Sequence, residues 1–414
     1  MSHNDYLFSD SRQFQGKRLH LGVTGSIAAY RTCDLLRLLQ KIGVQVSVTL
    51  SQGARQFVTP LLFEALGAAP VYADGSQLTP FAHLEPGEIA HALLIAPASA
   101  NSISRLAQGA ASDLLATQAL AFAGPLLIAP AMNPKMWHNQ AVQANIKLLR
   151  ERGWTVLEPG CGSTACGDLG QGRLCEISEL FWAVLRALSP QDFAGRRVML
   201  TLGPTREFWD GVRFWSNPSS GRMGADLALS CWLRGAQVSA VCGSSVAFDL
   251  PSDIKRYSVT SASEMYARAC ELFAHADMGI FTAAVSDFAP DARPLPEKCK
   301  KAQFPEHFDL PFHKNTDILL ELSQRKRPEQ KILAFAAETA SDMDQLLALA
   351  KEKRARKGAD LLAANCVNAQ DSGFVSATNT MAVVDAERSE KWPSMSKADV
   401  AWRLCTWLLQ TATC

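Results

Sequence analysis

The chain has 414 residues, of which 48% are hydrophobic and 20% are charged, and its formal net charge is +1. This composition predicts a globular cytoplasmic protein of two domains, with neither nucleic acid nor a membrane as partner. The N-terminal residues lack the apolar core of a signal peptide, and no apolar run reaches the ~18 residues of a membrane-spanning helix. The cysteines form no paired C-x-x-C sets, which favours reduced thiols over zinc, although Cys161 and Cys166 are close together.

The front half of the chain alternates short apolar strands with amphipathic helices. Strands are predicted at 19–24, 45–50, 92–96, 125–129 and 154–157, and helices at 28–42, 141–152 and 181–188. This alternation is typical of parallel strands joined by crossover helices, so the expected class is α/β.

The same pattern restarts after a break at 189–192. Strands are predicted at 197–202, 237–242 and 278–283, with a helix at 224–234 and another that Thr260 or Ser261 caps together with Glu264. We therefore predict two Rossmann-like domains with mostly parallel sheets, at 1–190 and 191–414. The segment 289–316 is rich in Pro and Lys, and it is predicted to be a long functional loop.

Turns that follow the front strands carry small and hydroxyl residues. Gly25 and Ser26 join the first strand to its helix, where backbone N–H groups can face a phosphate. Ser99, Asn101 and Ser102 directly follow another strand, the position at which open α/β sheets bind ligands. The glycine spacing is not G-x-G-x-x-G, and the first turn alone is equally compatible with a tight turn that binds nothing.

Three further segments are distinctive enough to indicate a family. PAMNPKMW covers 130–137, GSTACGDLGQGRL covers 162–174, and HLEPGEIAHALLIAPASAN starts at His83. In their order along the chain, 83–101, 130–137 and 162–174, they resemble the homo-oligomeric flavin-containing cysteine decarboxylases, although Pro86, Ile89 and His91 replace the usual Leu, Trp and Asp. The resemblance implies a flavodoxin-like domain that binds FMN through Gly25, Ser26, Ser51, Ser99, Asn101 and Ser102.

The same resemblance implies an FMN-dependent oxidative decarboxylation of phosphopantothenoylcysteine. Cys166, on a mobile glycine-rich flap, is the expected proton donor of the closing reductive step. Asn133 would hydrogen-bond the substrate carboxylate, and His83 would orient or deprotonate the substrate. A lone histidine or cysteine outside such motifs is more often structural, and this is the interpretation for Cys161, Cys175, His91 and His138.

The back half opens with RVMLTLGPTREFWDGVRFWSNPSSGRMG at 197–224. Glycine, serines and arginines before a helix N-terminus are typical of an anion site, but they also fit a solvated loop that caps a helix. The run is similar to the hallmark of phosphopantothenoylcysteine synthetases, and TAAVSDF, PEKCKK, KNTDIL, FAAET and KEKRARKGADLLAANCV extend the resemblance to residue 385.

This second resemblance implies ligation of 4'-phosphopantothenate to cysteine through an acyl-nucleotidylate, with CTP as co-substrate and Mg²⁺. Lys298 would catalyse the first step, Asn217 would hold the activated acyl group and Arg213 would assist. Asp287 would contact the nucleotide or its Mg²⁺. The other expected nucleotide and substrate residues are Ala284, Phe335, Lys353, Lys357 and Asn365.

Together the resemblances imply a bifunctional flavoprotein of coenzyme A biosynthesis, assembled as a homo-oligomeric dodecamer from trimers of the front domain and dimers of the back domain. One alternative is a flavoprotein that keeps only one activity and acts as a regulatory or binding subunit. A second is an NAD(P) oxidoreductase, which predicts a G-x-G-x-x-G motif that neither half shows. A third is a flavin prenyltransferase, which accounts neither for the A-C-G-D flap nor for residues 191–414.

Overall fold

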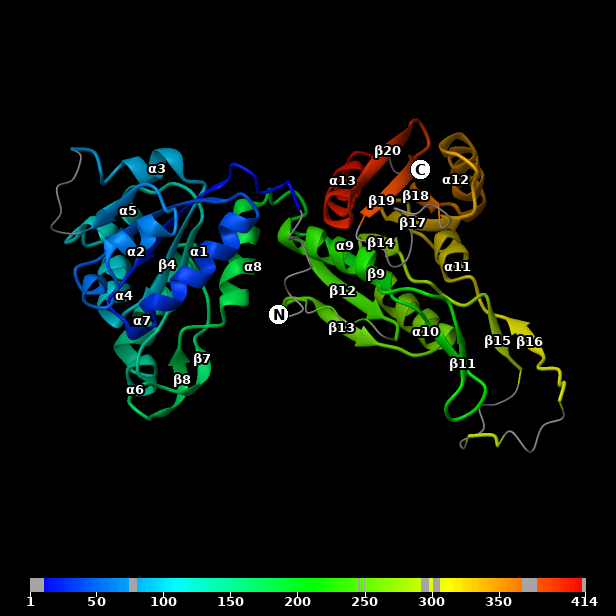
Figure 1. Ribbon diagram of the computed structural model, residues 1–414, viewed down its shortest axis with the longest axis horizontal. Coiled ribbons are helices and arrows are strands. Elements are labelled where there is room, and N and C mark those ends of the chain that lie inside the picture. Colours follow the sequence, from blue (N-terminus) through cyan, green and yellow to red (C-terminus); the bar gives the residue numbers. More distant parts are fainter. Residues whose placement is uncertain are drawn as a thin grey trace. The chain divides into compact units, whose positions relative to one another are not determined.

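The computed structural model describes residues 11–73, 80–244, 246, 248, 250–291, 298–300, 306–366 and 378–411. The chain forms two compact units that divide between Pro190 and Gln191. Each unit is a sheet covered by helices on both faces (Figure 1). In the described ranges, no helix is long and apolar enough to cross a membrane.

The front unit is built on a parallel six-stranded sheet in the order β3-β2-β1-β4-β5-β6. Its central strand, β4, is buried along its whole length, as expected for a parallel sheet with helices on both faces. The chain runs outward from β1 in one direction and from β4 in the other, so the order reverses between these two strands. The strands are β1 (Arg18–Val23), β2 (Gln45–Leu50), β3 (Val71–Ala73), β4 (Ala92–Ala98), β5 (Leu126–Pro130) and β6 (Thr155–Val156).

The helices of this unit lie on the two faces of the sheet. α1 (Thr32–Lys41) packs against α8 (Ile177–Leu188), while α4 (Ala100–Gln108) packs against α5 (Leu114–Ala121) and α7 (Gln140–Glu151). The helix predicted at 28–42 starts as a 3₁₀ turn, because Ser26 caps the Ala28 N–H. The short helices are α2 (Pro60–Ala65), α3 (Glu85–Ile89), α6 (Pro134–Trp137) and the 3₁₀ turns Ile27–Arg31 and Ala54–Gln56.

The glycine-rich segment 162–174, predicted to be a mobile flap, lies in an antiparallel hairpin of β7 (Gly160–Ser163) and β8 (Leu169–Arg173). Gly162 pairs with Gly170, so two residues without side chains let the strands pair at their tip. The hairpin is tied to the preceding loop, because the Met132 N–H donates to the Gly172 carbonyl at 2.8 Å. The glycines thus permit close backbone packing rather than a loose loop.

The back unit contains an eight-stranded sheet in the order β13-β12-β9-β14-β17-β18-β19-β20. All neighbouring strands are parallel except the pairs β18–β19 and β19–β20, which are antiparallel. Strand order again reverses, here between β9 and β14. The strands are β9 (Arg197–Leu202), β12 (Gln237–Cys242), β13 (Lys255–Ser258), β14 (Met278–Phe281), β17 (Lys331–Glu338), β18 (Leu361–Cys366), β19 (Thr378–Val384) and β20 (Ser389–Ser396).

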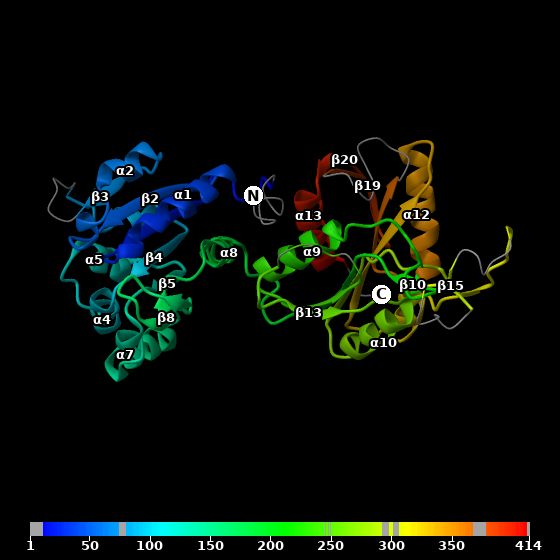
Figure 2. The ribbon, with the colours of Figure 1, turned by 60° about the horizontal axis from the view of Figure 1, so that its bottom comes forward.

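Two helices cover one face of the back sheet and three cover the other. α9 (Arg222–Leu233) and α13 (Lys397–Gln410) lie side by side (Figures 1 and 2). The opposite face carries α10 (Ala262–Phe273), α11 (Ile318–Gln324) and α12 (Met343–Lys357). Ser261 caps α10 in a capping box with Glu264, which confirms the sequence prediction.

Two small antiparallel ribbons extend from the back unit. One pairs β10 (Arg206–Phe208) with β11 (Phe214–Ser216), and the other pairs β15 (Phe288–Pro290) with β16 (Phe312–Lys314). The ribbons touch through Trp215 and Phe312, whose ring centroids are 5.5 Å apart. The loop prediction for 289–316 is therefore wrong at both of its ends, where β15 and β16 pair.

Candidate active sites

The first candidate site lies where strand order reverses in the front sheet. The Thr24 hydroxyl accepts the Ser99 N–H at 2.8 Å and donates to the Pro97 carbonyl at 2.7 Å, which ties the turn after β1 to the turn after β4. Ligands of open α/β sheets bind at such reversals. The predicted residues Gly25, Ser26 and Ser99 belong to these two turns, and Asn101 and Ser102 lie in the first turn of α4.

These turns fit a phosphate-bearing cofactor such as FMN. Ser99 caps α4, and the free N–H groups of the first helical turn suit an anion. A Cβ on Gly25 would lie 3.1 Å from the Gly53 backbone, so the turns after β1 and β2 approach each other closely. Ser51, also predicted, is buried, and its hydroxyl accepts the Ala54 N–H at 3.2 Å. Its side chain therefore shapes the turn after β2.

A cavity of about 450 Å³ connects this region to the β7–β8 hairpin. It brings together three predicted residues, Ser26, Asn133 and Cys166, from three separate segments. His83, the third predicted catalytic residue of this half, does not line the cavity; it is half-buried in the turn before α3.

Cys166 lies in a network of hydrogen bonds at the tip of the hairpin. The Asn133 amide nitrogen is 3.1 Å from the Cys166 sulfur and donates to Asp168 Oδ2 at 2.6 Å. Hydrogen bonds from the Thr164 hydroxyl, the Asp168 backbone and Asn133 lower the pKa of the exposed Cys166 thiol. A lowered pKa makes a thiol a better proton donor near neutral pH. The sequence analysis recognised the A-C-G-D motif but predicted no role for Asp168 or Thr164.

We expect Thr164→Val to raise the pKa of Cys166, because it removes the hydroxyl that contributes most to the lowering. Alkylation of Cys166 by iodoacetamide, followed by peptide mass spectrometry across a pH series, would then shift to higher pH, since only the thiolate reacts. Ser163→Ala, next to it on β7, is the control. A midpoint that stays unchanged in Thr164→Val would show that the hydroxyl does not stabilise the thiolate.

Glycine is required where the hairpin meets the Asn133 loop. A Cβ on Gly172 would lie only 2.4 Å from the Met132 carbonyl oxygen. A larger residue would push β8 away from the loop and separate Cys166 from Asn133. The Asn133 side chain is itself fixed, because its oxygen accepts the Lys135 N–H at 2.8 Å and caps α6. Its amide nitrogen therefore points toward the hairpin.

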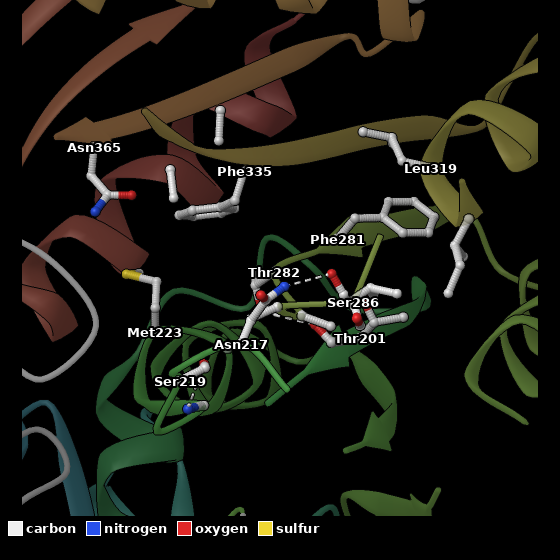
Figure 3. A pocket seen from close by; sticks show the side chains of 18 of the residues that line it. Thr201, Asn217, Ser219, Met223, Phe281, Thr282, Ser286, Leu319, Phe335 and Asn365 are labelled. Carbon is white, nitrogen blue, oxygen red and sulfur yellow. Dashed lines mark hydrogen bonds between the residues drawn. The ribbon is translucent and has the colours of Figure 1, made fainter. Parts of the chain in front are cut away.

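The second candidate site is a cavity of about 400 Å³ in the back unit, at the reversal between β9 and β14. Figure 3 shows Phe335 in its middle, between Asn365 on one side and Leu319 on the other. Most of the predicted nucleotide and substrate residues line this one cavity. They are Asn217, Ala284, Asp287, Phe335, Lys353, Lys357 and Asn365.

Short polar contacts hold the loops of this cavity together. Asn217 donates its amide to the Val285 carbonyl at 2.9 Å, and Thr282 donates to the Thr201 carbonyl at 2.8 Å (Figure 3). The Asn217 nitrogen carries two protons and this bond uses one of them, so its second N–H and its amide oxygen are left to face a ligand. A Cβ on Gly224 would lie 2.4 Å from Leu202, so glycine lets α9 begin directly against β9.

Three of the four cationic side chains that line the cavity in the described part of the chain are held by carboxylates, and the fourth is the buried Lys397. Lys353 pairs with Glu338 at 2.6 Å, Lys357 pairs with Asp317, and Arg222 pairs with Asp226 at 3.7 Å. Burial lowers the pKa of Lys357, and the charge of Asp287 opposes this lowering. Asp287 is therefore within electrostatic reach of a predicted phosphate-binding lysine. Ion-paired lysines of this kind can turn toward a triphosphate when it binds.

Lys298 and Arg213 do not line this cavity, although both were predicted to act there. They belong to a clamp between the β10–β11 ribbon and the segment 298–300. The fully buried Asp210 carboxylate accepts the Cys299 N–H at 3.2 Å, and Arg213 donates to the Cys299 carbonyl at 3.3 Å. Arg213 also pairs with Asp210 at 2.9 Å. The clamp fixes the backbone next to Lys298, a role for Asp210 that sequence reasoning missed.

A complete protein cage for a metal ion is not found in the described part of the chain. No group of three or more His, Cys, Asp or Glu residues there is placed to hold one. Mg²⁺ does not need such a cage, because it binds through one or two carboxylates together with substrate phosphates and waters. Asp287, exposed at the rim of the second cavity, fits this limited role.

Both halves of the chain match known family models. Residues 7–189 match the Flavoprotein family, and residues 193–411 match the DNA/pantothenate metabolism flavoprotein C-terminal domain. A coenzyme A biosynthesis bifunctional protein CoaBC from Vibrio vulnificus is 37% identical over 388 residues, which cover 92% of this chain and 95% of that protein. The chain belongs to this family of bifunctional coenzyme A biosynthesis proteins.

Further members of the family are similarly close. The CoaBC protein of Haemophilus influenzae is 39% identical over 86% of this chain and 88% of its own length. That of Escherichia coli is 38% identical, over 88% and 90% respectively. Among solved structures, the C-terminal domain of a CoaBC protein matches with 27% identity and a TM-score of 0.44, covering 53% of this chain and 97% of that one.

Membership decides between the functions that the sequence left open. The protein is a bifunctional enzyme of coenzyme A biosynthesis with a decarboxylase and a ligase activity. The single-activity alternative is not favoured, because both family models match. The flavin prenyltransferase alternative would leave 193–411 without explanation.

Proposed function

We propose that residues 1–190 carry the FMN-dependent phosphopantothenoylcysteine decarboxylase and residues 191–414 the CTP-dependent phosphopantothenate–cysteine ligase. Bound FMN would supply the two-electron chemistry that turns the cysteinyl end into a readily decarboxylated form. Gly25, Ser26, Ser51, Ser99, Asn101 and Ser102 would hold the cofactor. The protein would act as a homo-oligomer in the cytoplasm, with a dodecamer of trimers and dimers as the proposed assembly.

The contact between Asn133 and Asp168 carries the decarboxylase proposal. The Asn133 amide donates to the Asp168 carboxylate at 2.6 Å, so this amide is placed to bind a carboxylate. We assign the same amide to the carboxylate of the substrate. A neutral amide holds an anion without the charge that would oppose its loss as carbon dioxide. Cys166, 3.1 Å from the same amide, would then donate the proton that completes the product. His83 lies outside the cavity of its own protomer, so it would orient the substrate from a neighbouring copy in the proposed homo-oligomer.

In the ligase unit, we assign the nucleotide to the cavity around Phe335. The triphosphate would lie between Lys353, Lys357 and the N-terminus of α9, with Mg²⁺ shared by Asp287 and phosphate oxygens. The second amide N–H of Asn217 would hold the activated acyl group near Ala284. Lys298, on the clamped segment, would stabilise charge as the carboxylate attacks the α-phosphate.

The direct test supplies the full-length protein with phosphopantothenate, cysteine, CTP and Mg²⁺, and follows pyrophosphate and carbon dioxide separately. Release of both is expected, and ATP in place of CTP should support little turnover. Pyrophosphate without carbon dioxide would contradict the decarboxylase assignment. Carbon dioxide from supplied phosphopantothenoylcysteine without any pyrophosphate would contradict the ligase assignment.

Arg213→Met is expected to slow pyrophosphate release by roughly tenfold, because loosening the segment next to Lys298 misplaces the catalytic group. Asp210 keeps three backbone N–H donors in this variant, so the fold should survive. Decarboxylation of supplied phosphopantothenoylcysteine should not change. Arg268→Met is the matched control, since Arg268 likewise pairs with a carboxylate three residues away and stacks on an aromatic ring. An equal loss in both variants would refute the clamp.

A further inference from the structure

A buried polar network lies beneath the segment that carries His83. His20, on β1, is fully buried, and its two ring nitrogens lie 2.8 Å from the Ser47 hydroxyl and 3.0 Å from the Thr49 hydroxyl. Complete burial lowers the pKa of His20 to about 4, against the opposing effect of its hydrogen bond to Gln118. His20 is therefore neutral at physiological pH and can act as one donor and one acceptor.

The direction of these hydrogen bonds can be assigned. Thr49 donates its only hydroxyl proton to Gln118 Oε1 at 2.7 Å, so its oxygen can only accept from His20 Nε2. The other ring nitrogen, Nδ1, must then accept from Ser47. Gln118 is also completely buried. Its amide N–H extends the hydrogen-bond network by donating to the Ala82 carbonyl at 2.8 Å.

A second contact holds the same segment from its other side. The Tyr72 hydroxyl donates to Glu85 Oε2 at 2.6 Å, and the Tyr72 ring meets His20 edge to face with centroids 6.1 Å apart. His83 therefore lies between two anchored neighbours, Ala82 and Glu85. The two side chains that hold these neighbours, Gln118 and Tyr72, both contact the buried imidazole of His20.

We propose that Gln118 and Tyr72 are positioning residues for His83 and that His20 holds both of them in place. The network contacts the chain on either side of His83 and lies away from the cavity that contains Cys166 and Asn133. It thus controls where the His83 ring can lie rather than touching substrate. The inference rests on the proposed role of His83 in decarboxylation.

The test uses full-length, flavin-loaded protein and supplied phosphopantothenoylcysteine. Gln118→Met and Tyr72→Phe should each lower the decarboxylase kcat roughly tenfold with little change in KM, because a small displacement of an orienting group is costly. Peptides covering 80–89 should exchange amide hydrogens faster in both variants. The absorbance of the retained flavin reports that the front unit of each variant is folded, since both substitutions lie in that unit.

Gln330→Met is the matched control, because Gln330 is a buried glutamine of the ligase unit that also donates to backbone carbonyls, those of Phe273 and Ala276. It should leave the decarboxylase kcat and the exchange of 80–89 unchanged. An unchanged kcat, or unchanged exchange, in Tyr72→Phe and Gln118→Met would overturn the inference. Full activity of His83→Ala would instead refute the role of His83, while exchange would still decide whether the segment is anchored.

Discussion

Cys166→Ser is expected to release a single burst of carbon dioxide and then to accumulate the unsaturated ene-thiol in place of the saturated thiol product. Steady turnover should fall by about 10²–10⁴-fold, the range for loss of a general acid. Hydrogen bonds from Thr164, Asp168 and Asn133 lower the pKa of the Cys166 thiol, so that it can donate its proton at neutral pH. A serine hydroxyl in the same place is too weak an acid to donate its proton at that pH. Product mass and carbon dioxide, measured on the same samples, check the prediction.

Cys161→Ser is the control for this experiment. Cys161 lies on β7 of the same hairpin and is also exposed, but it does not line the cavity that contains Asn133. The Cys161→Ser variant should release carbon dioxide and saturated product at the parent rate. Saturated product from Cys166→Ser at the parent rate would mean that another group delivers the proton, and loss of even the first carbon dioxide would place Cys166 in an earlier step.

Lys298→Gln should lower pyrophosphate release by about 10²–10³-fold, which is the usual cost of removing one group that stabilises charge in the transition state. Its backbone neighbour Cys299 is pinned by Asp210 and Arg213, so the side chain starts from a defined position. Decarboxylation of supplied phosphopantothenoylcysteine should be unaffected, because that site lies in the other unit.

Lys300→Gln tests whether the effect belongs to Lys298. Lys300 follows Cys299 directly and has the same charge, so a general electrostatic effect of the segment would appear equally in both variants. A much smaller loss is expected for Lys300→Gln. Equal losses would contradict the assignment of Lys298 as the catalytic lysine.

Most of the parallel strands could be predicted, because their apolar runs are buried on both faces, but the parallel strands β3, β13 and β17 were missed. The predicted bounds of β2, β9 and β12 agree with the structure to the residue. The hairpin β7–β8 was missed because its pairing depends on glycines, which sequence patterns associate with loops. β20 was not predicted either, since an antiparallel strand at a sheet edge carries a weak apolar signal. β19, the strand beside it, was also missed, although most of its residues are buried.

Site residues could be predicted from the sequence where they lie within a recognisable motif. Asn133 and Cys166 do meet, and so do Asn217, Phe335 and Lys353. Asp210 was missed because its role is to hold another segment 89 residues away, which no local pattern reveals. The same holds for Gln118, whose partner carbonyl belongs to Ala82 on a different element.

The pre-paired cations of the ligase cavity have a kinetic consequence. Lys353, Lys357 and Arg222 each have a carboxylate partner. The cavity is also lined by Lys397 and by the Asp287 carboxylate, whose charges are opposite. The described side chains therefore present little net positive field to an approaching nucleotide. Long-range electrostatic steering, which speeds association of oppositely charged molecules and weakens as ionic strength rises, should therefore contribute little. Nucleotide capture would depend on short-range exchange of one ion pair for another, and its association rate should be nearly independent of salt.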